Sequence, residues 1–209
     1  MTTLLYQGHG SYRITANDGT VIYVDPFAGE GYDVPADVIL NTHDHPDHIC
    51  YDLMPHAAGC TLLVAKDFFD EDGSYVTHIT HGITATPVQA CNENHPIDAC
   101  VGLILDIDDV RIYASGDTST TEDISSGRIA AMKPDYALFC GDGIYNMDVV
   151  EASACARMVG AAHSIPVHLL PVSDFNDYEL FSEERATAFD APGKLVVRPG
   201  ETVDLITEK

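Results

Sequence analysis

The feature that most constrains this chain is a dense cluster of histidines and aspartates directly after an apolar strand. The strand predicted at residues 38–40 leads into Thr42-His43-Asp44-His45-Pro46-Asp47-His48. Alternate residues of an extended chain point to the same side, so His43 and His45 can bind one metal ion. The last two residues follow the turn at the proline and can face a second metal position. Imidazole and carboxylate ligands suit zinc, and also iron or manganese. A polar surface loop is the alternative, which this density and order disfavour.

Three further apolar strands are each followed by a residue that can bind a metal ion. The strand at 110–114 leads to Gly116-Asp117, the strand at 136–140 to Asp142, and the strand at 165–167 to His168. Ligands at strand ends along one edge of a sheet form rigid sites. The glycine before Asp117 permits a close backbone approach, so this carboxylate can bridge two metal ions. A turn or a helix cap is the alternative role for such an aspartate.

The rest of the pattern indicates a strand-rich chain with few helices. Asp148 and Glu151 form a capping-box pattern that predicts a helix over residues 148–162, and Ser182 caps a second helix over 182–189. We find no linker and no internal repeat, so we predict one domain over residues 1–209 that mixes α and β structure. Apolar runs predict strands at residues 3–6, 12–16, 20–24, 38–40, 61–65, 75–80, 83–90, 101–107, 110–114, 136–140, 164–169, 194–198 and 202–206.

Composition excludes several classes of partner. The chain has 33 acidic and 10 basic residues, a formal charge of −23 that is spread evenly along it. It therefore offers no basic stripe for nucleic acid or an anionic membrane surface. It has no apolar run of membrane-spanning length and no signal-peptide pattern at its start. The six cysteines form no C-x-x-C pair, and without a signal peptide we predict reduced thiols and a cytoplasmic location. Because the overall negative charge disfavours polyanionic partners, we predict a small-molecule substrate.

Because of these motifs, the chain resembles the metallo-β-lactamase superfamily. The H-x-H-x-D-H segment, Gly116-Asp117-Thr118 and His168 carry the resemblance. It extends to the small metal-dependent hydrolases of that superfamily, which are related to the L-ascorbate-6-phosphate lactonases. The resemblance implies the α+β fold with a four-layer αββα sandwich and a site at one edge between two sheets. The further segments that resemble this group are Gly8-His9-Gly10-Ser11-Tyr12, Ile22-Tyr23-Val24-Asp25-Pro26-Phe27, Cys91-Asn92-Glu93-Asn94-His95-Pro96, Ala191-Pro192-Gly193-Lys194 and Pro199-Gly200-Glu201.

The resemblance also implies a ligand set for two metal ions. It places His43, His45 and a third histidine on one metal, and Asp47, His48 and His168 on the other, with Asp117 as the bridge. We predict that His95 is the third histidine, because it precedes the strand at 101–107 as the ligand does in these hydrolases. The competitors are His78 and His81, whose surroundings favour ordinary half-exposed strand positions.

Two of the remaining polar candidates, His9 and Asp25, have two interpretations each. His9, between two glycines, either supports the site or contacts substrate, or is a plain turn residue. Asp25, at a strand end before Pro26, either orients a ligand histidine or only ends the strand. His56, in a predicted helix or loop, and His163, just past a predicted helix, are assigned structural roles.

These residues predict a hydrolase. Two metals would share a hydroxide that persists at neutral pH, because metal binding lowers the pKa of the bound water to about 7, and we expect that hydroxide to attack a small ester, lactone or phosphoester. Asp47 orients the nucleophile and passes on its proton. The sequence has no G-x-S-x-G, P-loop or G-x-G-x-x-G motif, which disfavours serine, nucleotide and dinucleotide chemistry. The alternatives are a di-iron redox protein on the same fold and a metal-dependent binding or regulatory protein without turnover.

Overall fold

Alternating apolar residues build a first sheet with one face turned toward the core. The computed structural model describes residues 1–207. β12, β1, β2 and β3 pair antiparallel, whereas β3, β4 and β5 pair parallel. In spatial order the sheet contains β12 (Thr202–Asp204), β1 (Thr3–Gly8), β2 (Ser11–Thr15), β3 (Val21–Val24), β4 (Ala36–Leu40) and β5 (His56–Leu63).

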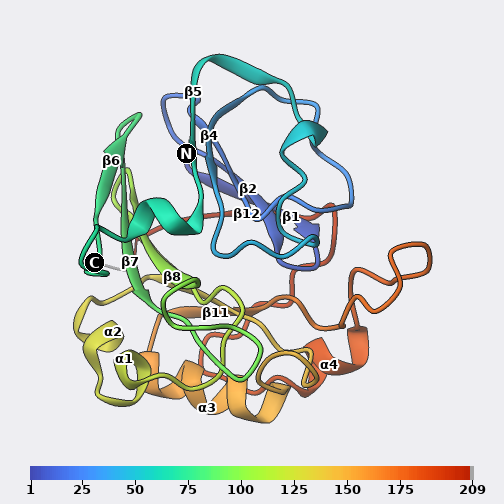
Figure 1. Cartoon of the computed structure of the whole chain (residues 1–209). Helices are drawn as coiled ribbons and strands as arrows, with labels where there is room; N and C mark the ends of the chain where they lie inside the picture. The colour runs from blue at the N-terminus through green and yellow to red at the C-terminus, as the bar shows by residue number, and fades with distance from the viewer. Residues whose placement is uncertain (208–209) are drawn as a thin grey trace.

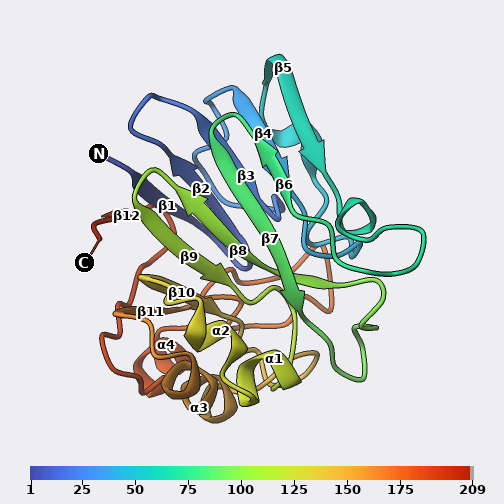
Figure 2. The ribbon, with the colours of Figure 1, turned by 90° about the vertical axis from the view of Figure 1, so that its left-hand side faces the viewer.

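The second sheet has the same size and a similar change of direction. In this sheet β6, β7, β8 and β9 pair antiparallel, and β9, β10 and β11 pair parallel. The two sheets pack against each other, as Figures 1 and 2 show. In spatial order the second sheet contains β11 (His163–Pro166), β10 (Tyr136–Phe139), β9 (Val110–Ala114), β8 (Val101–Ile107), β7 (Ile83–Gln89) and β6 (His78–Thr80).

The main hydrophobic core lies between the two sheets. Leu4, Ile14 and Val38 from the first sheet belong to one buried cluster with Leu103 and Leu138 from the second. A fully buried side chain of this size contributes about 1.5–3 kcal/mol. Burying one face of each sheet is therefore what fixes the pairing of the sheets, and it also fixes how the strand ends of one sheet stand relative to those of the other.

The helices cover the outer face of the second sheet (Figure 1). Both predicted helices are confirmed, although each is shorter than predicted: α3 is Val149–Val159 and α4 is Glu183–Ala188. The Asp148 carboxylate accepts the N–H groups of Val150 and Glu151 at 2.9 Å, and Gly160 ends α3 in the left-handed region. Two one-turn helices were not predicted, α1 (Glu122–Ser125) and α2 (Arg128–Ala131), because four residues carry too little periodicity.

The predicted fold class is confirmed, with a thinner outer layer on the first sheet. There, a third apolar cluster that includes Tyr23, Tyr32 and Met54 is covered by loop residues and the short 3₁₀ helix η1 (Tyr51–Leu53). A second 3₁₀ helix, η2 (Ala65–Phe68), follows β5. None of the helices in residues 1–207 is long and apolar enough to cross a membrane.

Two predicted strands are corrected by the structure. Residues 194–198 form no strand, because Val197 reaches the core from irregular chain and only Lys194 makes a bridge, to Ser164. The strand predicted at 75–80 is limited to β6, because Tyr75 pairs with Phe69 instead of with β7. In both places the alternating sequence pattern reflects partial burial of the side chains, although the backbone does not form the hydrogen bonds of a strand.

Candidate metal centre

The candidate site lies where strands from both sheets end at one edge. β1, β3 and β4 run in one direction in the first sheet, and β9, β10 and β11 are mutually parallel in the second. Their carboxyl ends therefore meet at a common edge, as the sequence predicted for the candidate ligands. The polar residues that follow these ends are His9, Asp25, the segment 43–48, Asp117, Asp142 and His168.

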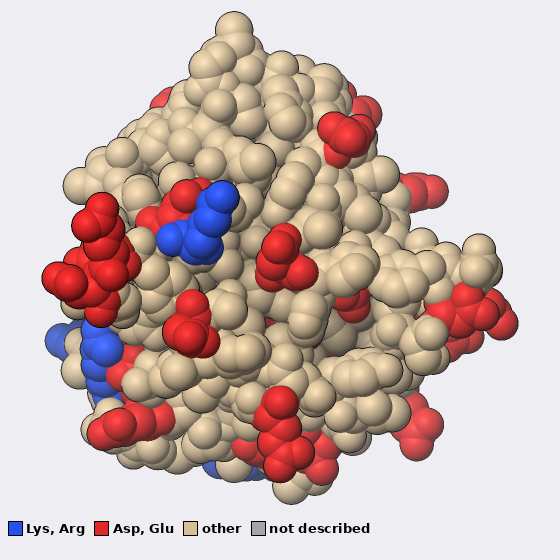
Figure 3. Space-filling model, in the orientation of Figure 1, with Lys and Arg blue, Asp and Glu red and all other residues tan. Residues whose placement is uncertain are grey.

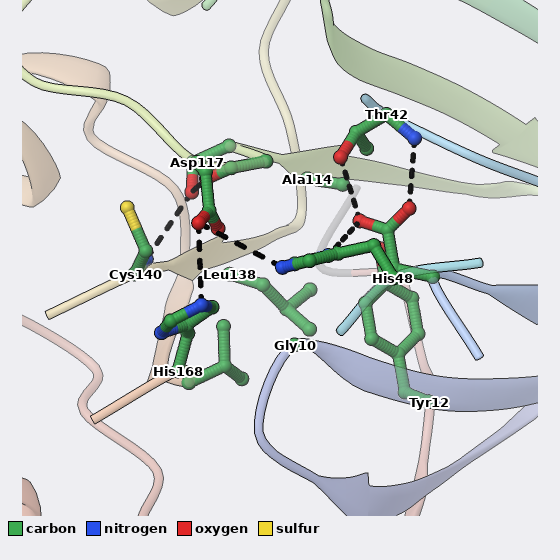
Figure 4. Close-up of a pocket in the computed structure, with 13 residues that line it drawn as sticks. Gly10, Tyr12, Thr42, His48, Ala114, Asp117, Leu138, Cys140 and His168 are labelled. Carbon is green, nitrogen blue, oxygen red and sulfur yellow. Dashed lines mark hydrogen bonds and ion pairs between the residues drawn. The ribbon is translucent and has the colours of Figure 1, made fainter. Parts of the chain in front are cut away.

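Asp117 lies at the centre of this group. It is buried, and Figure 4 shows its carboxylate between the rings of His48 and His168. A single oxygen, Oδ2, faces four imidazole nitrogens. The distances from Asp117 Oδ2 to the Nε2 atoms are 3.2 Å for His168, 3.5 Å for His95, 3.7 Å for His48 and 3.9 Å for His43.

The side chains around Asp117 form two separate groups, each compact enough for a metal ion, and a third set, Asp25, His43 and His48, overlaps both of them. One group is His43, His45 and His95, with their ring centroids 4.6–4.9 Å apart. The potential ligand atoms within each group lie within 4.8 Å of one another. The second group is His9, Asp47, His48 and His168. This division matches the predicted ligand sets, except that His9 joins the second group.

The unsatisfied nitrogens show that these groups fit metal ions. The Nε2 atoms of His43, His48, His95 and His168 are buried without a hydrogen-bond partner, and a buried polar atom without a partner is costly. Four such nitrogens around one carboxylate are a typical metal-binding arrangement. The opposite ring nitrogens face other groups: Thr42 Oγ1 at 3.0 Å from His43, Asn92 Oδ1 at 2.9 Å from His95, Asp25 Oδ2 at 3.3 Å from His48 and Asp142 Oδ2 at 3.5 Å from His168.

Two of the four histidines are in the neutral form that a metal ligand needs, and the carboxylates around the third favour a positive charge. Burial holds the pKa of His43 well below its ordinary value, and burial also lowers the pKa of His95, so both rings are neutral and can donate a lone pair. Burial alone would raise the pKa of Asp117, but His168 and His48 outweigh it and keep the carboxyl ionised. Burial opposes the charge on His48 too, yet Asp117 and Asp25 raise its pKa to about 9. The two carboxylates therefore attract a positive charge to this position.

Hydrogen bonds from Asn41 and Thr42 hold the segment 43–48 in place. The side-chain amide of Asn41 donates to the backbone oxygen of His43 at 2.6 Å and to that of His48 at 3.3 Å, so it ties both ends of the loop. Thr42 donates from its N–H and its hydroxyl to the two oxygens of Asp25, each at 2.7 Å (Figure 4). Because Asp25 Oδ2 also lies 3.3 Å from His48 Nδ1, Asp25 links Thr42, before the segment, to the ring at its end.

Glycine is required at one position beside the ligands. A Cβ on Gly10 would lie 2.9 Å from His48 Cε1, closer than packed atoms come. Its neighbour His9 has a φ of 54°, in the left-handed region. The His9 ring is fully buried against that of His168, with the centroids 3.6 Å apart, and its Nε2 is 3.1 Å from Asp47 Oδ2. His9 is therefore part of the site and is not a plain turn residue.

Two supporting residues were not predicted in the roles that the structure shows. Asp142, noted only as a possible ligand at a strand end, lies behind His168 with its carboxylate fully buried. The Asn146 amide donates to Asp117 Oδ2 and to Asp142 Oδ2, both at 2.7 Å. The strand-end position signals Asp142, whereas nothing in the local sequence distinguishes Asn146, whose contact with Asp117 spans 29 positions.

Four other histidines lie outside both groups. The Nε2 atoms of His56, His78 and His81 contact backbone carbonyls of Tyr51, Asp67 and Gly59 at 2.9, 2.7 and 3.2 Å. The ring of His163 stacks on Tyr136, with the centroids 4.8 Å apart. His56 begins β5 and His163 begins β11, so the helix or loop predicted for His56 is wrong. The structure brings His95, and neither His78 nor His81, to the other ligands.

Comparison with known proteins identifies the family. The family model described as "Beta-lactamase superfamily domain" matches residues 3–168, which include every residue of both groups. The chain belongs to the metallo-β-lactamase superfamily. A superfamily relative from Saccharolobus solfataricus, the UPF0173 metal-dependent hydrolase SSO0099, is 26% identical over 239 residues and covers 98% of this chain and 100% of its own.

Solved structures confirm the fold and show that it serves more than one chemistry. Igni18, a metallo hydrolase from Ignicoccus hospitalis, superposes with a TM-score of 0.70 at 19% identity and covers 99% of both chains. CmlA, a diiron β-hydroxylase from Streptomyces venezuelae, superposes with a TM-score of 0.69 at 12% identity, over 98% of this chain and 54% of its own. The reaction must therefore be argued from the site.

A histidine substitution tests the first ligand group. We expect His95→Ala to lower the metal content from two ions to about one per chain, because three imidazoles become two. Mass spectrometry of the dialysed protein measures the content. His78→Ala is the matched control and should keep both ions. A full complement in His95→Ala, or a loss in His78→Ala, would contradict the assignment.

Proposed function

We propose that this protein is a binuclear metal-dependent hydrolase that cleaves a small ester, lactone or phosphoester. The observation that carries the proposal is the set of four buried, unpartnered Nε2 atoms around Asp117. The names of its UPF0173 relatives as metal-dependent hydrolases support the same reaction class.

Each metal has a proposed set of ligands. His43, His45 and His95 would hold one ion, and Asp47, His48 and His168 the other, with Asp117 between them. Zinc suits this mixture of imidazole and carboxylate, and iron or manganese also fits. When bound, such a pair supplies a water of lowered pKa and polarises the group that is attacked.

Asp47 is the residue we assign to proton transfer. Its side chain is partly exposed, in contrast to the buried Asp117, so it can reach a substrate. Burial and His168 lower the pKa of His9 to about 3, so its ring is neutral, and its Nε2–H can donate to Asp47 Oδ2. Burial would raise the pKa of Asp47, but this hydrogen bond and the nearby histidines keep it below its ordinary value. The free oxygen can then accept a proton from the attacking water and pass it to the leaving group.

The opening and the surface both favour a small substrate. A cavity of ≈ 210 Å³ lies directly over the site and is lined by residues of both groups, among them His45, His95, Asp47 and His168. On the face shown in Figure 3, acidic side chains are spread widely, and the basic ones lie toward its left side and lower edge. These features support our proposal that nucleic acids and anionic membranes are not partners.

Asp47→Asn is the experiment that tests this function. The amide keeps the shape but cannot accept the proton, so we expect turnover of esters, lactones or phosphodiesters to fall about 10²–10⁴-fold. The metal should stay bound, more weakly, through His48 and His168, the proposed histidine ligands of the second ion, together with Asp117. The readouts are kcat on a substrate panel, with and without chelator, and metal content by mass spectrometry.

Three outcomes of that experiment would overturn the proposal. Equal activity of Asp47→Asn would contradict the role of Asp47. Bound iron with a visible redox signal and no hydrolysis would favour a di-iron redox protein. A full metal complement with no turnover across the panel would favour a binding or regulatory protein.

A further inference from the structure

Part of the lining of the cavity at the metal centre is apolar or aromatic. Besides the candidate ligands, the cavity is lined by Pro46, Tyr145, Val172 and Phe175, which we call the wall. No Lys or Arg is among the lining residues. A substrate whose reacting group lies at the candidate ligands would therefore place its remaining part against carbon.

The aromatic side chains of this wall are exposed but held in place. Phe175 is 51% exposed and Tyr145 is 41% exposed. Phe175 packs edge-on against Phe27 at 5.9 Å between centroids, and Tyr178 lies 5.1 Å from the same ring. The Phe27 ring is in turn 5.3 Å from that of His9. The wall is thus continuous with the second ligand group.

A separate set of hydrogen bonds fixes Tyr145. Its backbone N–H donates to Asp142 Oδ1 at 2.7 Å, and its carbonyl accepts from Asn94 Nδ2 at 3.0 Å. Asp142 also faces His168, and Asn94 precedes the candidate ligand His95. Exposed apolar groups supported this closely are typical of ligand sites, because an unused apolar surface is unfavourable in water.

The charges around the wall exclude an anionic group at that position. Asp174 and Asp177 flank the aromatic side chains and are exposed. Lys66 lines a different cavity, where Asp44 and Asp98 oppose its charge. Because no Lys or Arg lines the cavity, its positive charge would come from the metal ions of the proposed function, at the reacting end of the substrate.

We infer that the wall of Pro46, Tyr145, Val172 and Phe175 binds an apolar group of the substrate that carries no negative charge, which makes esters or lactones with a short hydrocarbon chain the favoured class. The inference rests on the proposed hydrolase function and narrows its substrate. The cavity limits the size of the group, since ≈ 210 Å³ accommodates only a short chain. Phosphoesters with a charged remainder are disfavoured.

A homologous series of esters tests the inference on the metal-loaded protein. For p-nitrophenyl acetate, butyrate and hexanoate we expect kcat/KM to rise about fourfold per added methylene until the cavity is filled. An ester of the same length that ends in a carboxylate should be at least about tenfold poorer. Equal rates along the series, or a preference for the carboxylate ester, would overturn the inference and leave the hydrolase function intact.

Variants separate the wall from the catalytic machinery. Phe175→Ala should flatten the chain-length dependence, mainly through KM, and should not change metal content. Ile79→Ala, an exposed apolar residue in the edge strand β6, is the matched control and should behave like the parent protein. A chain-length dependence that survives Phe175→Ala unchanged would contradict the role of this side chain.

A binding measurement tests the wall even if no ester is hydrolysed. Saturation-transfer NMR on the chelator-treated protein should detect binding of hexanamide but not of adipate, and Phe175→Ala should weaken the hexanamide signal. Absence of binding by hexanamide, or stronger binding by adipate, would overturn the inference whatever the activity. Absence of hydrolysis together with hexanamide binding would reject the proposed function alone.

Discussion

Asp117→Ala is expected to release metal from both positions and to reduce hydrolysis by roughly 10³-fold or more, beyond the 10–100-fold that loss of a residue supporting a ligand costs. The reason is geometric, because Oδ2 of this one carboxylate lies 3.2–3.9 Å from the Nε2 atoms of four histidines. Without it, two groups of imidazoles would have to hold divalent cations with no shared negative charge. Metal content and kcat/KM are the measurements.

A second buried carboxylate provides the control for Asp117→Ala. Asp123 is as buried as Asp117, but it accepts hydrogen bonds from Gln89 and Arg128, away from the candidate ligands. Asp123→Ala should lower the melting temperature and leave both metals bound. Normal activity of Asp117→Ala, or loss of metal from Asp123→Ala, would show that the centre is not organised around Asp117.

Chelation is expected to lower the melting temperature by roughly 5–11 °C for each metal removed. A ligand present at 100 times its Kd stabilises the native state by about 2.7 kcal/mol, and 1 kcal/mol corresponds to about 2–4 °C for a domain of this size. The chain carries a formal charge of −23, so the cations also relieve repulsion between carboxylates such as Asp47 and Asp117.

Thermal unfolding with and without chelator measures this effect. Re-addition of zinc should restore the melting temperature of the parent protein, and Asp117→Ala should respond to neither treatment. An unchanged melting temperature in the parent protein after complete chelation would be incompatible with a structural contribution from metal at this centre.

The candidate ligands could be predicted because their signals are local or recur at strand ends. The segment 43–48 shows its chemistry in six consecutive residues, and Asp117 and His168 follow apolar strands that the pattern identifies. The structure brings all of them, with His95, to one place. Their assignment as ligands stays a prediction that the substitutions above will test.

Two supporting residues, Asn41 and Asn146, could not be predicted, because their roles depend on tertiary contacts. Asn41 follows β4 like any polar strand end, and only the folded loop shows that its amide joins His43 to His48. Asn146 reaches Asp117 from a loop between β10 and α3. The same limit applies to residues 194–198, where burial of Val197 produces an alternating pattern without a strand.

The assembly of the centre from both sheets has a consequence for folding. His43 and His48 follow a strand of the first sheet, whereas Asp117 and His168 follow strands of the second. Neither sheet alone carries a complete set of the proposed ligands, so full metal loading would have to wait until the two sheets have docked. During synthesis His168 emerges only after four-fifths of the chain, which would make capture of a second ion a late event and a direct reporter of the native interface between the sheets.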